Sequence, residues 1–376
     1  MLLACAAVPL LMSATPTSPA ATGSAATRPA ATADSATVGL PYVALGDSYS
    51  AGYGLQPLTD RPVPGCAQSA QDYPHRLAAA LDLDLTDVSC SGAVTADVTS
   101  TAQDTGEGTA PPQDAALSSS TRIVTLTIGG DDLGFSQIAA YCVALSRNGP
   151  LLAHPLQADC RRHYTAAGPD NLGDKLRTTV SPAVAATLRT IHTRAPNAKV
   201  FVLGYPALAP DAADTPPGGC FRPTVGYPLP ADGYPFTNTD VPFLLQTEQA
   251  LDSTISADAL AAGDTFVPTL EASVAHTPCA ASTQPAGTPW VNGLSLSSLL
   301  PPSLQPGALH PDAAGVGYLT TQLTTTIKNA FPPNPTLMDT LAAPRILVPA
   351  LALIAVGGAI LLLRRRRTRT RPAQRH

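Results

Sequence analysis

The chain has 376 residues, of which 44% are hydrophobic and only 13% are charged, and its formal net charge is -5. The charges are unevenly distributed along the chain, because eight of the 22 Lys and Arg residues lie from Arg345 onward. Residues 1–344 therefore have 14 basic and 27 acidic residues and a net charge of -13. An acidic body of this kind argues against a nucleic acid as partner, and the length suits one α/β domain with flanking segments.

The N-terminal residues 1–20 predict a truncated signal peptide, because a small-residue-rich apolar run opens the chain without a preceding basic residue. The residues up to Cys5 resemble a lipoprotein box, but almost nothing stands before them, which favours the signal peptide. Residues 21–39 consist mainly of Ala, Thr, Ser and Pro. This composition cannot build a core, so it predicts a disordered spacer.

The C-terminal part predicts a membrane anchor. From Ile346 to Leu363 the chain has 18 uncharged, mainly apolar residues, which are enough to cross a bilayer as a helix. Residues 364–376 are rich in arginine, and positive residues remain on the cytoplasmic side of a membrane. We therefore expect a single-pass protein of the cell membrane, with a domain (residues 40–331) outside the cell, a Pro-rich linker (332–345) and a basic cytoplasmic tail (364–376).

Strand-like and helix-like segments alternate through residues 40–331. Short apolar or β-branched runs predict strands at 42–46, 84–89, 122–128, 199–204 and 265–270. Longer amphipathic segments predict helices at 73–81, 182–194, 240–262 and 312–330. Such alternation favours an α/β fold, a three-layer α/β/α sandwich with a mainly parallel five-stranded sheet. Three long loops, residues 55–70, 206–238 and 276–308, are expected to wall a cleft.

Seven cysteines are present, and six of them are spread through the predicted domain. Their spacing lacks the close pairs of a zinc site, and an even number suggests three disulfides formed in an oxidising compartment. Buried free thiols are the alternative. The simplest pairing is sequential: Cys66–Cys90, Cys142–Cys160 and Cys220–Cys279.

Gly46, Asp47 and Ser48 directly follow the first predicted strand. A strand that ends in a small, polar turn places a serine at the carboxyl edge of the sheet, where open α/β sheets build their sites. A serine hydroxyl becomes a good nucleophile only if a base takes its proton and hydrogen-bond donors stabilise the oxyanion. Ser48 is therefore the candidate nucleophile.

Candidates for the other roles lie at the same edge. His310 lies in the loop before the last predicted helix, from which a base could reach Ser48. Gly92 follows the second predicted strand and can offer a backbone N–H, while Asp131 and Asp132 follow the third. Three strand ends and one loop before a helix thus converge on one place.

This ordered set resembles the SGNH (GDSL-type) hydrolase family, and within it the secreted actinomycete lipases and esterases. The resemblance covers roughly residues 40–330: residues 42–54 match the first block, Gly92 the second, residues 129–132 the third and His310 the last. It implies Ser48 as nucleophile, His310 as general base, and the N–H groups of Ser48 and Gly92 as oxyanion-hole donors. The sequential disulfide pairing also resembles that of the secreted branch.

Asp131 departs from the family pattern, which has an asparagine there as the third oxyanion donor. An ionised carboxylate accepts hydrogen bonds and cannot donate them. Three interpretations stay open. In the first, Asp131 makes the enzyme slower or shifts its activity to acidic pH, where a protonated Asp131 can donate a hydrogen bond. In the second, Asp132 or a backbone group replaces it as the oxyanion donor, and in the third the domain binds its ligand without cleaving it. A protonated aspartate has a precedent in ketosteroid isomerase, the known example of this effect.

The second departure concerns the acid of a catalytic triad, because Gly307 stands where many family members have an aspartate. We expect the Gly307 carbonyl to orient His310, which gives a Ser–His dyad. Asp312 is expected to cap the closing helix. Trp290 either lines the cleft or has a structural role. The five other histidines, which lack partners at metal-ligand spacing, are expected to be surface or loop residues: His75, His154, His163, His192 and His276.

Together these features predict a carboxylic ester hydrolase that acts on a small-molecule or lipid ester through an acyl-enzyme. We expect a monomer that needs neither metal nor cofactor. The alternatives are a catalytically weakened binding module on the same fold and an esterase that acts on acetylated cell-surface carbohydrate, because substrate choice depends on the loops rather than on the fold.

Overall fold

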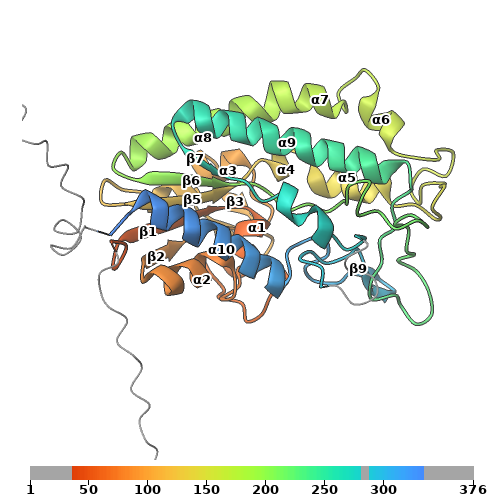
Figure 1. The fold of residues 1–376 in the computed structure, drawn as a ribbon, viewed down its shortest axis with the longest axis horizontal. Coiled ribbons are helices and arrows are strands. Elements are labelled where there is room, and N and C mark those ends of the chain that lie inside the picture. Colours follow the sequence, from red (N-terminus) through yellow and green to blue (C-terminus); the bar gives the residue numbers. More distant parts are fainter. Residues whose placement is uncertain (1–35, 281–287, 334–376) are drawn as a thin grey trace, which may run out of the picture. The chain divides into compact units, whose positions relative to one another are not determined.

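A single sheet holds five strands, in the order β2-β1-β5-β6-β7, and all four neighbouring pairs are parallel. The computed structural model describes residues 36–280 and 288–333, and Figure 1 shows the sheet between two layers of helices. The strands are β1 (Pro41–Gly46), β2 (Asp84–Asp87), β5 (Ile123–Thr127), β6 (Lys199–Leu203) and β7 (Thr265–Val267). The predicted three-layer sandwich is confirmed, although β2 and β7 end earlier than predicted.

Side chains of the strands alternate between the two faces of the sheet, as the pleat requires. Tyr42 and Ala44 of β1 point to one face, where they pack with residues of α2 (Tyr73–Leu81) and α10 (Ala313–Ala330). Val43 and Leu45 point to the opposite face and join a larger cluster. That cluster includes residues of α8 (Ser181–Arg194) and α9 (Asp240–Ala262). Figure 1 shows these two helices on one side of the sheet and α2 and α10 on the other.

The long helices begin and end where the sequence predicts, because residues at their ends satisfy backbone groups. Asp312 caps α10 as predicted: its carboxylate accepts hydrogen bonds from the N–H groups of Ala314 and Gly315, each at 2.8 Å. Gly263 ends α9 in the left-handed conformation, with φ of 84°.

Several short elements were not predicted, because segments of two to eight residues carry too little periodicity. They include two hairpins, β3 (Gln103–Asp104) with β4 (Thr109–Ala110) and β8 (Leu296–Leu299) with β9 (Pro302–Leu304). The short helices are α1 (Ser48–Ala51), α3 (Thr95–Thr99), α4 (Gly130–Leu133), α5 (Phe135–Cys142), α6 (Arg161–Thr165) and α7 (Leu172–Lys175).

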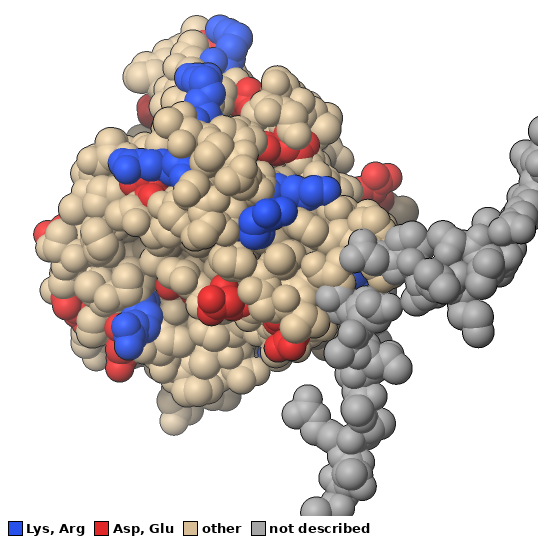
Figure 2. All heavy atoms as spheres, turned by 90° about the vertical axis from the view of Figure 1, so that its left-hand side faces the viewer, with Lys and Arg blue, Asp and Glu red and all other residues tan. Residues whose placement is uncertain are grey.

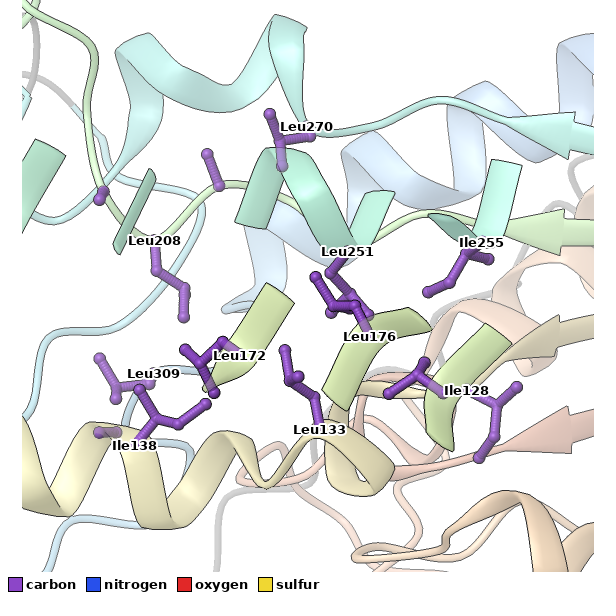
Figure 3. Close-up of a cluster of buried hydrophobic side chains, with 14 of the residues drawn as sticks. Ile128, Leu133, Ile138, Leu172, Leu176, Leu208, Leu251, Ile255, Leu270 and Leu309 are labelled. Carbon is purple, nitrogen blue, oxygen red and sulfur yellow. The ribbon is translucent and has the colours of Figure 1, made fainter. Parts of the chain in front are cut away.

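The larger cluster extends from the sheet to the short helices. Leu133 and Ile138, from α4 and α5, and Leu309, from the loop before α10, belong to it (Figure 3). Since Leu309 is only 5% exposed, the loop that precedes α10 is held against the core rather than hanging free.

The three predicted disulfides form: Cys66–Cys90, Cys142–Cys160 and Cys220–Cys279. They join the loop before α2 to the residues after β2, the end of α5 to the start of α6, and the loop after β6 to the segment after β7. The alternative of buried free thiols is therefore wrong.

Several predicted segments lie outside the described residues: the signal peptide, the spacer up to residue 35, most of the linker, the span at 346–363 and the basic tail. Within residues 36–280 and 288–333, no helix is both long enough and apolar enough to cross a bilayer. Thr37 and Gly39 are attached to the domain rather than part of a spacer, because the buried Thr37 hydroxyl donates to the Leu81 carbonyl at 3.0 Å and Gly39 N donates to the Asp82 carbonyl at 2.7 Å.

Candidate active site

The turn after β1 presents Ser48. Asp47 caps the short helix α1, and its Oδ1 accepts a hydrogen bond from Tyr49 N at 2.9 Å. Ser48 is the first residue of α1, so its N–H is one of the donors that a helix start leaves without an intrahelical partner. Gly46 has a φ of 132°, and a Cβ there would lie 2.4 Å from the Thr127 carbonyl oxygen. The turn therefore needs glycine before Asp47.

Gly46 is held by a side-chain amide that the sequence reasoning missed. Gln113 Oε1 accepts from Gly46 N at 2.7 Å, and Gln113 Nε2 donates to Gly46 O at 2.9 Å. Cys90 N also donates to Gly46 O, at 3.1 Å, which joins the turn after β2 to the turn after β1. These bonds fix the turn of Ser48 and the turn of Gly92 to each other.

His310 meets Ser48 as predicted. Its Nε2 lies 2.7 Å from Ser48 Oγ, and its Nδ1 lies 2.8 Å from the carbonyl oxygen of Ala308. A carbonyl can only accept, so Nδ1 carries the proton and Nε2 is free to accept from the serine hydroxyl. The imidazole is therefore in the tautomer that a general base needs.

The predicted role of Gly307 is wrong, because the carbonyl that contacts His310 Nδ1 belongs to Ala308. The Gly307 carbonyl instead accepts from His310 N at 2.9 Å and from Asn292 Nδ2 at 3.1 Å. Leu309 has a φ of 59°, and this left-handed residue turns the chain so that the Ala308 carbonyl reaches the ring. A backbone carbonyl still contacts the ring, but it is that of Ala308 in place of the predicted Gly307.

Aromatic rings surround His310 and affect its protonation. Tyr49 and Tyr53 have their ring centroids 4.9 and 5.0 Å from the imidazole. Burial lowers the pKa of His310 to about 4, against a smaller opposing effect of the hydrogen bond to Ala308. His310 is therefore neutral over the whole range above pH 5 and can take a proton.

Gly54 presses against the histidine loop. Its φ is 93°, and a Cβ there would lie 2.3 Å from Gly307 Cα. We expect Gly54→Ala to displace His310 from Ser48 and to lower kcat by about 10²-fold, since displacements of about 1 Å cost that much. Gly106→Ala is the matched control, because Gly106 also has a positive φ, 78°, but nothing lies within 4 Å of its Cβ. Equal kcat values in the two variants would contradict the role of this contact.

Gly92 and Asp131 line the same cavity as Ser48 and His310. The four residues come from the turns after β2, β5 and β1 and from the loop before α10, as the sequence predicts. Burial, and next the nearby carboxylates of Asp132 and Asp97, raise the pKa of Asp131 to about 6. Asp131 therefore carries a proton in mildly acidic solution and loses it near neutral pH.

Asp132 is occupied elsewhere. Its carboxylate accepts from Thr95 N at 3.0 Å and from Thr95 Oγ1 at 2.6 Å, which ties α4 to the start of α3. Unlike Asp131, Asp132 is not among the residues that line the cavity of Ser48. The structure thus gives no support to Asp132 as a substitute oxyanion donor.

A second connection under the site involves Tyr205, which the sequence reasoning did not single out. Its hydroxyl donates a short hydrogen bond to Asp47 Oδ2 and accepts from Gly130 N at 3.0 Å. Burial, followed by the charge of Asp131, raises the pKa of Asp47. Tyr205 thereby joins the turn that holds Ser48 to the turn that holds Asp131.

The cavity beside Ser48 has a volume of about 740 Å³ and a mainly apolar lining. Two of the three predicted loops contribute: residues 206–238 through Phe221 and Val225, and residues 276–308 through Leu294 and Leu304. The third predicted loop, residues 55–70, contributes no lining residue. Its place is taken by α5 and the segment after it, which the sequence reasoning did not predict.

Of the two roles predicted for Trp290, the structure favours packing over lining the cleft. It stacks between His276 and Tyr318, with ring centroids 3.7 and 4.3 Å away, and it does not line the cavity of Ser48. His154 and His163 stack on Tyr141. These histidines are half-buried packing residues rather than free surface groups.

His75 contradicts the prediction that these histidines lack partners at metal-ligand spacing. Its Nδ1 lies 2.7 Å from Asp72 Oδ1 and 3.6 Å from Asp87 Oδ2. The three residues offer ligand atoms within 4.8 Å of one another, but Asp72 Oδ1 is already engaged as the cap of α2, accepting from His75 N at 2.8 Å. Burial raises the pKa of Asp72 to about 8 and also raises that of Asp87. Burial therefore keeps at least one of these two neighbouring carboxyls protonated near neutral pH.

This pair predicts a stabilising substitution. The pKa of Asp72 is raised from 3.8 to about 8 on folding, so the stability present below pH 3.8 is progressively lost as the pH rises through 8. An asparagine in place of Asp72 would keep the cap and could donate to Asp87 Oδ2, which has no hydrogen-bond partner among the described residues. Asp72→Asn should therefore raise the free energy of unfolding at pH 8 by about 1–3 kcal/mol and change it little at pH 4. Urea unfolding at both pH values checks this; a variant less stable at pH 8 would refute the raised pKa of Asp72.

Comparisons with known proteins agree with the geometry. The sequence profile of the GDSL-like Lipase/Acylhydrolase family matches residues 44–317. Lipase 2 of Streptomyces coelicolor is 34% identical over 277 residues, which are 73% of this chain and 82% of the relative. An esterase of Streptomyces scabiei is 30% identical over 64% of this chain and 72% of its own. Among solved structures, phospholipase A1 from Streptomyces albidoflavus is 26% identical with a TM-score of 0.55, and the match covers 77% of this chain and all of that one.

Proposed function

The chain belongs to the GDSL-like lipase and acylhydrolase family, in its actinomycete branch, and is a carboxylic ester hydrolase; on that basis we propose that it is a membrane-anchored extracellular esterase or lipase with a Ser–His dyad. The observation that carries the mechanism is the 2.7 Å contact between Ser48 Oγ and His310 Nε2. The Ala308 carbonyl holds the ring by accepting from Nδ1 at 2.8 Å. Ala308 thus serves as the orienting group that an aspartate provides in a triad.

In the first half of the reaction Ser48 Oγ attacks the carbonyl carbon of the ester while His310 Nε2 takes the hydroxyl proton. The oxyanion that forms lies near the N–H groups of Ser48 and Gly92, which are the proposed donors. His310 then passes the proton to the leaving alcohol. The carbon–oxygen bond to the alcohol breaks, and the acyl group stays on Ser48.

In the second half, water replaces the alcohol. His310 Nε2 takes a proton from the water, whose oxygen attacks the acyl carbonyl, and the proton returns to Ser48 Oγ as the acid leaves. Both halves need a neutral imidazole. Burial supplies it, because the pKa of His310 is lowered to about 4.

Asp131 sets the pH range of the reaction. When it is protonated, its hydroxyl can donate to the oxyanion; when it is ionised, it repels the developing charge. Because its pKa is raised to about 6, whereas that of His310 is lowered to about 4, both groups are in the active form between these values. We propose an esterase that works best in mildly acidic solution, rather than an inactive binding module.

The apolar cavity supports an acyl group as the part of the substrate that it binds. Its volume of about 740 Å³ lies in the range of small-molecule sites, and leucine, valine, phenylalanine, alanine and proline side chains line most of it. A carbohydrate site would need more polar groups for the sugar hydroxyls. The cavity therefore favours a lipid or fatty ester over acetylated cell-surface carbohydrate.

We also propose that the catalytic domain lies outside the cell, on the basis of the sequence and the disulfides. Three disulfides among the described residues favour an oxidising compartment. The apolar run at 346–363 and the arginines after it favour an anchor with a cytoplasmic C-terminus.

Hydrolysis of a short-chain nitrophenyl ester by purified residues 36–333 tests the proposed activity. We expect turnover at pH 5 without added metal or cofactor. No turnover at any pH between 4 and 8 would contradict the proposed function and favour the binding module.

A further inference from the structure

Exposed apolar side chains gather in three segments that also line the cavity of Ser48. Eleven large apolar residues are exposed among the described residues, and eight of them fall in three segments at 145–156, 225–227 and 299–304. The remaining three are Val38, Leu58 and Leu260. We call the eight residues the apolar rim: Leu145, Leu152, Leu156, Val225, Tyr227, Leu299, Leu300 and Leu304.

The apolar rim is continuous with the cavity of Ser48. Leu145, Leu152, Val225 and Leu304 line that cavity and are each more than half exposed, so the cavity wall runs outward into solvent. Leu156, Tyr227 and Leu300 extend the same segments and are fully or almost fully exposed. Contiguous exposed apolar surface on a soluble domain marks a site of protein or membrane interaction.

Charge is nearly absent from the segments that carry the rim. Residues 294–306 contain no charged residue, and residues 143–157 contain only Arg147. In residues 221–232 the charges of Arg222 and Asp232 pair at 3.2 Å. By contrast, Figure 2 shows a face with Lys, Arg, Asp and Glu side chains spread across it. This face is the left-hand side of Figure 1, opposite the side on which β9 and α6 lie.

We propose that the apolar rim is a docking surface for a lipid–water interface and delivers ester molecules from a lipid aggregate into the cavity of Ser48. The proposal rests on the proposed esterase function and names how its substrate is presented. The occupant is a lipid surface rather than a second copy of the chain, because a protein seated on the rim would close the mouth of the cavity. A neutral rim on an acidic body binds zwitterionic lipid by apolar burial, so the binding should not weaken as the salt concentration rises.

The test compares two triple variants of residues 36–333. We expect this part to fold without the rest of the chain, since this chain matches the whole length of the similar phospholipase structure. Leu156→Gln, Tyr227→Gln and Leu300→Gln remove rim residues that do not line the cavity. Val38→Gln, Leu58→Gln and Leu260→Gln are the matched control, because they remove the same number of exposed apolar side chains elsewhere.

Sedimentation with phosphatidylcholine vesicles measures binding, and a soluble short-chain nitrophenyl ester measures the dyad. We expect the native domain and the control to bind the vesicles alike and the rim variant to bind more than about tenfold less, with equal rates on the soluble ester. Equal binding by all three proteins, no binding by the native domain, or a dimer that the rim variant dissociates would overturn the proposal. If the binding pattern holds while none of the proteins cleaves the soluble ester, the docking surface stands and the proposed function fails.

Discussion

Ser48→Ala is expected to lower kcat on a soluble ester by more than about 10³-fold, because no other group can form the acyl-enzyme once the hydroxyl is gone. The substitution removes the hydroxyl oxygen that lies 2.7 Å from His310 Nε2 and leaves the backbone of α1 in place. The loss should therefore appear in kcat, while the stability of the fold changes little.

Ser136→Ala is the matched control for Ser48. Ser136 lies on α5, lines the same cavity and also carries a hydroxyl, but among the described residues the hydroxyl that pairs with His310 Nε2 is that of Ser48. Steady-state rates of both variants at pH 5 make the comparison. A large loss in Ser136→Ala, or a small one in Ser48→Ala, would place the nucleophile elsewhere.

Asp131→Asn is expected to have the second largest effect, and its sign depends on pH. The pKa of Asp131 is raised to about 6, so the native protein loses its protonated form as the pH rises through that value. Asparagine donates at every pH. The variant should exceed the native enzyme in kcat/KM by about tenfold at pH 7 and about 100-fold at pH 8, and should match it at pH 5.

Asp132→Asn serves as the control for this prediction. It removes a neighbouring negative charge that helps to raise the pKa of Asp131, so the fall in kcat/KM should move to lower pH. Rates measured from pH 4 to pH 8 separate the two variants. If Asp131→Asn changed the rate by the same factor at every pH, the protonation of Asp131 would not control the activity.

The sequence was sufficient to predict the sheet and the reacting pair. Buried parallel strands are short apolar runs, and β1, β5 and β6 were found because their residues are almost all apolar or β-branched. Ser48 and His310 were found because each lies where a strand or loop meets the sheet edge. Their contact follows from the fold, since parallel strands bring their carboxyl ends together.

The supporting contacts could not be read from the sequence, because they depend on which backbone atom faces which side chain. The Ala308 carbonyl orients His310, whereas Gly307 was expected, because the left-handed turn at Leu309 decides which carbonyl reaches the ring. Gln113 and Tyr205 reach the site from 67 and 158 residues away and show no local motif. The wall made by α5 was missed for a similar reason, since an eight-residue helix gives a weak pattern.

Labelling with a fluorophosphonate probe, followed by peptide mapping, tests the account most directly. In that account His310 activates Ser48 as the nucleophile, and a protonated Asp131 stabilises the negative charge that forms when Ser48 attacks. The probe forms a stable bond with an activated serine. We predict a single label, mapped to Ser48, that forms faster at pH 5 than at pH 8. A label on another residue, or none at either pH, would contradict the account.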